Sequence, residues 1–397
     1  MRPSTRLVRF DACPGDPWKP TATPIYQTAT FAQDSATEFG AYDYSRSGNP
    51  TRAVLEQQLA ALEHGERGLA FASGMAALAA LVRLVPTGGH IVAGDDLYGG
   101  THRLLTRVAS RAGVRTSFAD VTDCAAIERA IEPRTAWVLV ETPTNPLQKV
   151  ADLRELARVV HERGAKLAVD NSCLSPLLQR PLELGADLVV HSATKHLCGH
   201  GDVSAGAVVA REAALGSELA FLQNAEGTGL GPFDSYLLLR GMKTLDVRLA
   251  RAQANAAEVA VWLAKQPGVR RVHYVGLAEH PQRALHESQA SGAGSLISFE
   301  TGSFERSRRI VESLRRFTIA VSCGNVASSV SLPCAMSHGS IPAAERTLPT
   351  DLVRLSIGIE DVRDLLEDLD RAIETAPDSE QAPPALVAEP QRRRART

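Results

Sequence analysis

Short apolar runs alternate with amphipathic stretches through the first two thirds of the chain. Four runs are almost wholly apolar and end in polar residues: His90–Gly94, Ala136–Thr142, Lys166–Asn171 and Asp187–Ser192. Continuously apolar strands are typical of parallel sheets that helices cover on both faces. The pattern therefore predicts an α/β fold with a mainly parallel sheet.

Helical spacing and capping residues mark the segments between these runs. A helix is predicted to begin at Asn49-Pro50, because asparagine is a favoured N-cap and proline fits the first helical position. This helix is predicted to end at His64-Gly65. A second helix is predicted over Asp152–Arg163, where apolar residues recur on one face.

The pattern changes after Lys243. A long helical run comes first, and the strand-like runs that follow are fewer and further apart, which predicts a smaller α+β domain. The predicted elements of this domain are Leu245–Lys265, Gly294–Thr301, Thr318–Cys323, Leu352–Gly358 and Val362–Ile373. The expected division of the chain is an N-terminal arm over 1–45, an α/β domain over 46–243, the α+β domain over 244–376 and a disordered tail over 377–397.

Composition narrows the class of protein. With 44% hydrophobic residues, the 397-residue chain can bury a large core, and its net charge of −2 gives no field that would attract nucleic acid. No apolar stretch reaches the roughly 18 residues of a membrane span. Six scattered cysteines without a CxxC pair indicate free thiols, so a cytoplasmic location is expected.

Polar groups cluster where the predicted strands end, which is where ligands bind in open α/β sheets. Ser73–Leu78 reads as a Ser-Gly turn that enters a helix, and such a helix start binds phosphate or is simply an ordinary helix start. Asp170 closes an apolar strand, where it is a helix cap, a metal ligand or the partner of a buried cation.

Lys195 directly follows another buried strand and is one of only six lysines in the chain. A lysine at such an edge often has a lowered pKa and forms Schiff bases. The competing interpretation is a metal site formed by His191, His196, Cys198 and His200, but their spacing fits no common zinc motif.

Phosphate donors, a strand-end acid and a buried lysine are together the parts that a pyridoxal phosphate (PLP) site requires. Tyr98 adds an aromatic face that could stack on the cofactor ring. A nicotinamide site is disfavoured, because GAGSLI near Gly292 is not GxGxxG and lies outside the βαβ part.

At these residues the sequence resembles the Cys/Met-metabolism family of PLP enzymes, the cystathionine synthases and lyases, over about Thr21 to Ala372. The motifs that carry the resemblance are YDYSRSGNPTR, FASGMAA, DDLYGGT, ETPTNP, VDNSCLSP, PLELGADLVVHSATKHLCGHGDVSAG, GPFDSYLLLRGMKTL and LVRLSIGIED. Three further segments are most similar to the plant-type cystathionine β-lyases: FLQNAEGTGLGPFDSYLLLRGMKTL, GAGSLISFETGS and SLPCAMSHGSIP.

The resemblance implies the aminotransferase-like fold of type I PLP enzymes and a role for each matching residue. Lys195 and Tyr98 would be catalytic, with Lys195 binding the cofactor covalently and Asp170 pairing with its ring nitrogen. The other cofactor contacts would be Tyr44, Arg46, Gly74, Met75, Tyr98, Asn145, Ser192 and Thr194. The substrate contacts would be Arg354, Ser322, Arg103 and Tyr98, with Arg354 gripping the α-carboxylate.

Tyr44 and Arg46 match residues that reach the phosphate of a neighbouring subunit, which implies at least a homodimer and usually a homotetramer. The implied reaction is α,β-elimination of cystathionine or a related S-substituted cysteine, without nucleic-acid or membrane partners and without a metal. Two alternatives remain: γ-synthase or γ-lyase chemistry, possible because the same lysine serves both routes, and a non-catalytic PLP-binding regulator.

Several positions depart from the family pattern. Ala327 stands where γ-synthases and γ-lyases usually carry glutamate, and Gly100 stands where methionine γ-lyases have cysteine. Ala327 favours β-elimination or an altered substrate, and Gly100 disfavours methionine γ-lyase activity. Four more positions are unusual, and they are read either as neutral drift or as a pocket adapted to another substrate: Cys173, His196, Gly201 and Cys323.

Overall fold

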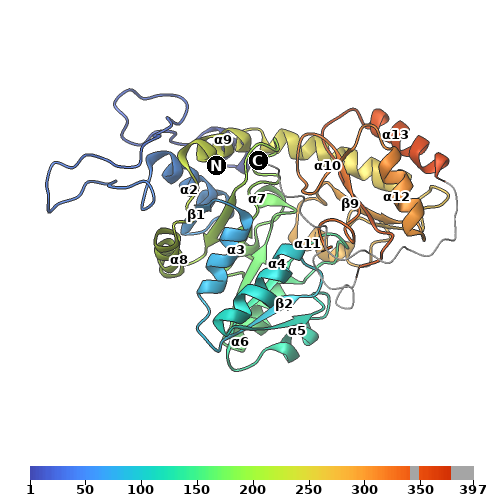
Figure 1. The fold of residues 1–397 in the computed structure, drawn as a ribbon, viewed down its shortest axis with the longest axis horizontal. Helices are drawn as coiled ribbons and strands as arrows, with labels where there is room; N and C mark the ends of the chain where they lie inside the picture. Colours follow the sequence, from blue (N-terminus) through green and yellow to red (C-terminus); the bar gives the residue numbers. More distant parts are fainter. Residues whose placement is uncertain (340–347, 377–397) are drawn as a thin grey trace, which may run out of the picture.

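A computed structural model gives the fold and describes residues 1–339 and 348–376 (Figure 1). The expected tail over 377–397 and the end of the SLPCAMSHGSIP motif, from Ser340, lie outside the described residues.

A seven-stranded sheet forms the centre of the larger part, in the order β1-β7-β6-β5-β4-β2-β3. Its strands are β1 (Arg67–Phe71), β2 (His90–Gly94), β3 (Arg115–Ala119), β4 (Thr135–Glu141), β5 (Lys166–Asp170), β6 (Leu188–His191) and β7 (Gly206–Ala210). Neighbouring strands are parallel except that β7 runs antiparallel to β1 and to β6. The mainly parallel sheet is confirmed.

Helices cover both faces of this sheet, so that one buried apolar cluster lies on each face. The helices of this part are α1 (Pro3–Val8), α2 (Pro50–Glu63), α3 (Gly74–Arg83), α4 (Gly99–Arg103), α5 (Cys124–Ala130), α6 (Leu153–Glu162), α7 (Ser175–Leu178), α8 (Ala213–Glu226) and α9 (Pro232–Met242). The predicted Asn49 cap is confirmed, because its side chain accepts from the N–H groups of Thr51 and Arg52. Asp152, predicted as the first residue of its helix, instead caps α6 by accepting from the Glu155 N–H.

A five-stranded sheet, in the order β10-β11-β12-β9-β8, forms the smaller part. Its strands are β8 (Arg271–His273), β9 (Leu296–Glu300), β10 (Thr318–Ile319), β11 (Ser329–Ser331) and β12 (Val353–Ser356). Its helices are α10 (Leu245–Leu263), α11 (Arg283–Gln289), α12 (Phe304–Ser313) and α13 (Val362–Thr375). In Figure 1 the yellow α10 leads from the larger part to the smaller one, where α12 and α13 lie.

One predicted strand is shorter than expected. The run Thr318–Cys323 pairs as a strand only at its first two residues. The chain then leaves the sheet and reaches Ser322 with a φ of 90°, which extended strands do not allow. This departure brings residues 321–323 to the cavity described below.

The N-terminal segment is only partly a free arm. Helix α1 buries Leu7, and the Gln58 side chain of α2 donates to the Arg6 carbonyl at 2.6 Å, a contact that the arginine-rich start did not predict. Between α1 and α2 the chain is largely exposed and irregular, and it projects from the body as the blue loops of Figure 1. Within the described ranges, no helix is long and apolar enough to cross a membrane.

Candidate active site

A cavity of about 430 Å³ lies at the carboxyl ends of β4, β5 and β6. Residues from the smaller part, including Arg354 of β12, complete its wall. The predicted site residues that line it are Gly74, Met75, Tyr98, Arg103, Asn145, Asp170, Ser192, Thr194, Lys195, Ser322 and Arg354. Positions scattered over the sequence therefore meet in one place.

Lys195 lies in the turn directly after β6, where its main-chain N–H donates to the Ser192 carbonyl at 3.0 Å. Its Nζ donates to the Ser322 hydroxyl at 2.6 Å. Ser322 adopts a left-handed φ that residues other than glycine rarely take. The backbone is therefore strained at the residue whose hydroxyl contacts the amine. The contact orients the lysine in the cavity.

Asp170 ends β5 and holds its carboxylate through the following turn. The Ser172 hydroxyl donates to it at 2.5 Å and the Ser172 N–H at 3.0 Å. Burial raises the pKa of Asp170, while these two hydrogen bonds and the nearby His191 and Lys195 oppose that rise. The same Ser172 hydroxyl accepts from the Ser192 N–H at 2.6 Å, so it ties the turns after β5 and β6 together.

Helix α3 points its N-terminus into the same cavity. The Ser73 side chain caps it by accepting from the Ala76 N–H, and the helix begins at Gly74. A side chain at Gly74 would meet the Ser192 Cβ at 2.9 Å, so only glycine allows this approach. The first N–H groups of the helix and two nearby hydroxyls, Ser192 and Thr194, form a donor set suited to a phosphate.

Arg354 is 3% exposed and comes from β12. One terminal nitrogen donates to the Asn145 side-chain oxygen at 3.1 Å, and the other donates to the Ser322 carbonyl at 2.9 Å. Its buried Nε has no hydrogen-bond partner among the described residues. A guanidinium held in this way presents its remaining N–H groups to a carboxylate.

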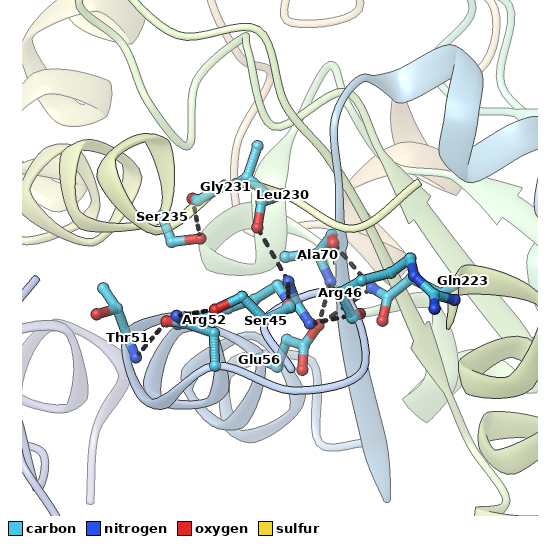
Figure 2. A network of polar contacts seen from close by, with 11 residues as sticks. Ser45, Arg46, Thr51, Arg52, Glu56, Ala70, Gln223, Leu230, Gly231 and Ser235 are labelled. Carbon is cyan, nitrogen blue, oxygen red and sulfur yellow. Dashed lines mark hydrogen bonds and ion pairs between the residues drawn. The ribbon is translucent and has the colours of Figure 1, made fainter. Parts of the chain in front are cut away.

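Tyr44 and Arg46 lie outside this cavity. Arg46 donates to the Asn224 carbonyl at 2.8 Å, and its guanidinium carbon lies 5.5 Å from the centre of the Tyr44 ring. Figure 2 shows why this loop keeps its shape: the buried Arg52 donates to the carbonyls of Ser45 and Arg46. The loop is thus fixed to its own subunit, while Tyr44 remains 42% exposed.

The residues of the alternative metal site have other partners. His191 Nε2 lies 2.6 Å from the buried Glu63, and His200 Nδ1 lies 2.7 Å from the Cys198 carbonyl. Burial, followed by Arg248 and Lys195, lowers the pKa of the His196 imidazole to about 4. Across residues 1–339 and 348–376, no group of three or more histidine, cysteine or acidic side chains could hold a metal.

Sequence reasoning missed several residues of the cavity wall: Glu141, Ser172, Ser204, Val321, Met336 and Ser337. A signal existed for Glu141, because it ends β4 as Asp170 ends β5. Cys173 and Cys323, noted only as unusual positions, also line the cavity and pack together with Leu296.

The fold and the cavity together define an α/β enzyme built around PLP, since the lysine, the buried carboxylate and the helix start match the three functional groups of that cofactor. The chain belongs to the Cys/Met metabolism PLP-dependent enzyme family, which it matches over residues 4–374.

Named relatives share most of the chain. It is 52% identical to the chloroplastic cystathionine beta-lyase of Arabidopsis thaliana, over 94% of this chain and 81% of the relative. It is 44% identical to a cystathionine gamma-lyase of Bacillus subtilis, over 94% of this chain and all of the relative. The crystal structure of cystathionine gamma-lyase from Lactobacillus plantarum complexed with L-serine superposes with a TM-score of 0.92 at 40% identity, covering 95% of this chain and 99% of that one.

Proposed function

We propose that this PLP-dependent enzyme is a carbon–sulfur lyase that acts on cystathionine or a related S-substituted cysteine by α,β-elimination. Cystathionine and water would give homocysteine, pyruvate and ammonia. The observation that carries the proposal is the convergence of Lys195, Asp170 and Arg354 on one cavity. The similarity to cystathionine beta-lyases, at 48–52% identity, supports the β-elimination.

The cavity residues divide naturally among the parts of the cofactor. The start of α3 at Gly74 and Met75, with the hydroxyls of Ser192 and Thr194, would bind the phosphate. Asp170 would hold the proton at the ring nitrogen. When bound, PLP supplies an aldehyde carbon for amines and a ring that accepts the electron pair released at the substrate Cα.

Two further side chains complete the cofactor site. Tyr98 would stack on the ring, and Asn145 would lie near its 3′-oxygen. Asn145 also accepts from Arg354, so one amide would link the cofactor site to the substrate site.

The substrate would be held by Arg354, which binds its α-carboxylate, while Lys195 accepts the Cα proton. The Ser322 hydroxyl, which accepts from the Lys195 amine, would direct that amine toward Cα. Tyr98 and Arg103 line the same cavity and would contact the rest of the substrate. The thiolate then leaves Cβ, and water releases pyruvate and ammonia.

Gamma-elimination is the second candidate, and the similarity to a cystathionine gamma-lyase at 44% identity favours it. The exposed Ala327, where γ-enzymes of the family usually carry glutamate, supports β-elimination instead. Incubating the purified enzyme with cystathionine and quantifying pyruvate and 2-oxobutyrate separately tests this. Dominant pyruvate is expected, whereas dominant 2-oxobutyrate would refute β-elimination.

The proposal includes a homodimer that pairs into a homotetramer, with Tyr44 and Arg46 reaching the phosphate of the neighbouring subunit. Their position outside the cavity of their own subunit supports this. Mixing an inactive Lys195→Ala protein with an inactive Arg46→Ala protein should restore part of the activity, because one site of each mixed dimer is intact. No recovery after subunit exchange would count against a shared site.

We also propose a cytoplasmic location, supported by six cysteines that are all free. Three plant relatives carry the word chloroplastic in their names, so location differs within the family. Fractionation of the source cells with an antibody to the protein tests the assignment.

A further inference from the structure

A second carboxyl group lies next to Asp170 in the cavity. Glu141 ends β4, and it is the register partner of Asp170 on the parallel strand β5. Side chains of register partners point to the same face of a sheet, and neighbouring strands lie about 4.8 Å apart. The two acids therefore share one buried neighbourhood, in which Glu141 is only 6% exposed.

The groups nearest the Glu141 carboxyl group are a main-chain N–H and a cysteine thiol. The Cys173 thiol donates to the Glu141 Oε1 at 3.6 Å, and the Tyr98 main-chain N–H faces the same carboxyl group. Neither lysine nor arginine forms an ion pair with it among the described residues. Glu141 thus lies beside the start of α4, where Tyr98 is located, and within residues 1–339 and 348–376 no cation pairs with it.

Two ionised carboxylates in such a position would repel each other strongly, since little water screens them. Burial, followed by Asp170 and Asp96, raises the pKa of Glu141 well above its ordinary value. Asp170, by contrast, has two hydrogen bonds from Ser172 and a nearby Lys195 that favour its charged form. The proton of the pair therefore belongs on Glu141.

We propose that Glu141 is a positioning residue that works in its protonated form: it fixes the Tyr98 main chain and leaves Asp170 as the single carboxylate available to the cofactor ring nitrogen. The inference rests on the proposed function, because it takes Tyr98 and Asp170 as parts of the cofactor site. Glu141 would position the main chain in its neutral form, whereas Asp170 must be ionised to pair with the ring nitrogen.

Infrared spectroscopy of the holoenzyme tests the protonation directly. The band of a protonated carboxyl group should be present in the wild type and in a Cys173→Ala control, and it should disappear in Glu141→Gln. The same band in Glu141→Gln would overturn the proposal. This readout does not depend on turnover, so it remains valid even if cystathionine proves not to be the substrate.

Kinetics test the positioning. Glutamine keeps a donor and an acceptor and stays neutral, so Glu141→Gln should retain kcat within about threefold of the wild type, whereas Glu141→Ala should lose about tenfold, as expected for one lost buried hydrogen bond. The cofactor absorbance should depend on pH in the wild type, because Glu141 ionises beside Asp170 when the pH rises above its raised pKa, and it should depend on pH less in Glu141→Gln. Equal kcat for the alanine and glutamine variants, or identical absorbance titrations, would refute the role.

Discussion

Replacing Arg354 by alanine tests the assignment of the substrate carboxylate most directly. The guanidinium has five N–H groups. One is used at Asn145 and one at Ser322, and the Nε–H is unpartnered among the described residues. Three N–H groups are therefore not committed to the protein, which is enough for a two-pronged contact with a carboxylate.

The magnitude follows from those two prongs. Each hydrogen bond to a charged group contributes about 2 kcal/mol, so losing both should cost about 4 kcal/mol. At 1.36 kcal/mol per tenfold change, kcat/KM should fall about a thousandfold. Arg354→Lys keeps the charge but loses the planar fork, so its loss should be smaller, about a hundredfold.

The assay is pyruvate release from cystathionine, measured over a range of substrate concentrations alongside the cofactor absorbance spectrum. Arg271→Ala is the matched control, because Arg271 lies in the same sheet but outside the cavity. The spectrum should be unchanged in all three variants, since Arg354 is assigned to the substrate and not to the cofactor. If Arg354→Ala retained kcat/KM within about threefold of the wild type, the carboxylate assignment would be wrong.

Three further outcomes are expected. Lys195→Ala should abolish the cofactor absorbance of the lysine adduct and reduce pyruvate release by at least about 10³-fold, as measured by absorbance and product assay. Because the pKa of His196 is lowered to about 4 from 6.5, the unfolded chain binds an extra proton between these values. Stability should therefore fall, by up to about 3 kcal/mol, as the pH drops through this window, and urea unfolding of His196→Phe should show a weaker pH dependence. Arg52→Ala should lower stability by about 3 kcal/mol in the same assay, because it removes a buried cation that bonds three carbonyls and lies 3.7 Å from Glu56, while Arg52→Lys should lose less.

Local patterns predicted four strands of the larger sheet, β2, β4, β5 and β6, because these strands are mostly buried and read as continuous apolar runs. The run His90–Gly94 is observed with the same bounds, and three other runs differ by a residue or two at their ends. Strands β1, β3 and β7 were not predicted. Strand β7 follows β6 through a connection without a helix, and its antiparallel pairing depends on β1, far away in sequence. Pairing between distant segments leaves no local periodicity.

Contacts between distant segments also limited the prediction of the cavity. Lys195 and Asp170 could be found because each closes an apolar strand, but nothing near Ser322 in sequence shows that its hydroxyl accepts from the Lys195 amine. The strand expected over Thr318–Cys323 would have carried Ser322 within a sheet, whereas the left-handed turn there moves it to the lysine. Arg354 was found through its motif match alone. An arginine on a strand can equally have a purely structural role, so its position by itself did not indicate a substrate contact.

The proposed catalytic and binding groups come from two sheets, so the proposed chemistry depends on how these sheets are placed relative to each other. A hydrogen-bonded chain runs from Lys195 through Ser322 to Arg354 and on to Asn145, and it crosses from the larger part to the smaller and back. A shift of the smaller part would therefore misplace the base and the carboxylate site together.

Two glutamine side chains of the smaller part bind main-chain groups of the larger part and hold the two parts together at a second point. Gln282 donates to the Val150 carbonyl at 2.5 Å and accepts from the Val150 N–H at 2.9 Å. Gln289 of α11 binds the Ala151 carbonyl and the Leu153 N–H in the same manner. Each glutamine copies the pairing of a strand, and the segment that it grips begins five residues after Asn145. The smaller part thus contributes Arg354 and also holds the loop that carries Asn145, to which Arg354 donates. The proposed PLP site is centred on one sheet, but it therefore depends on the second sheet as well.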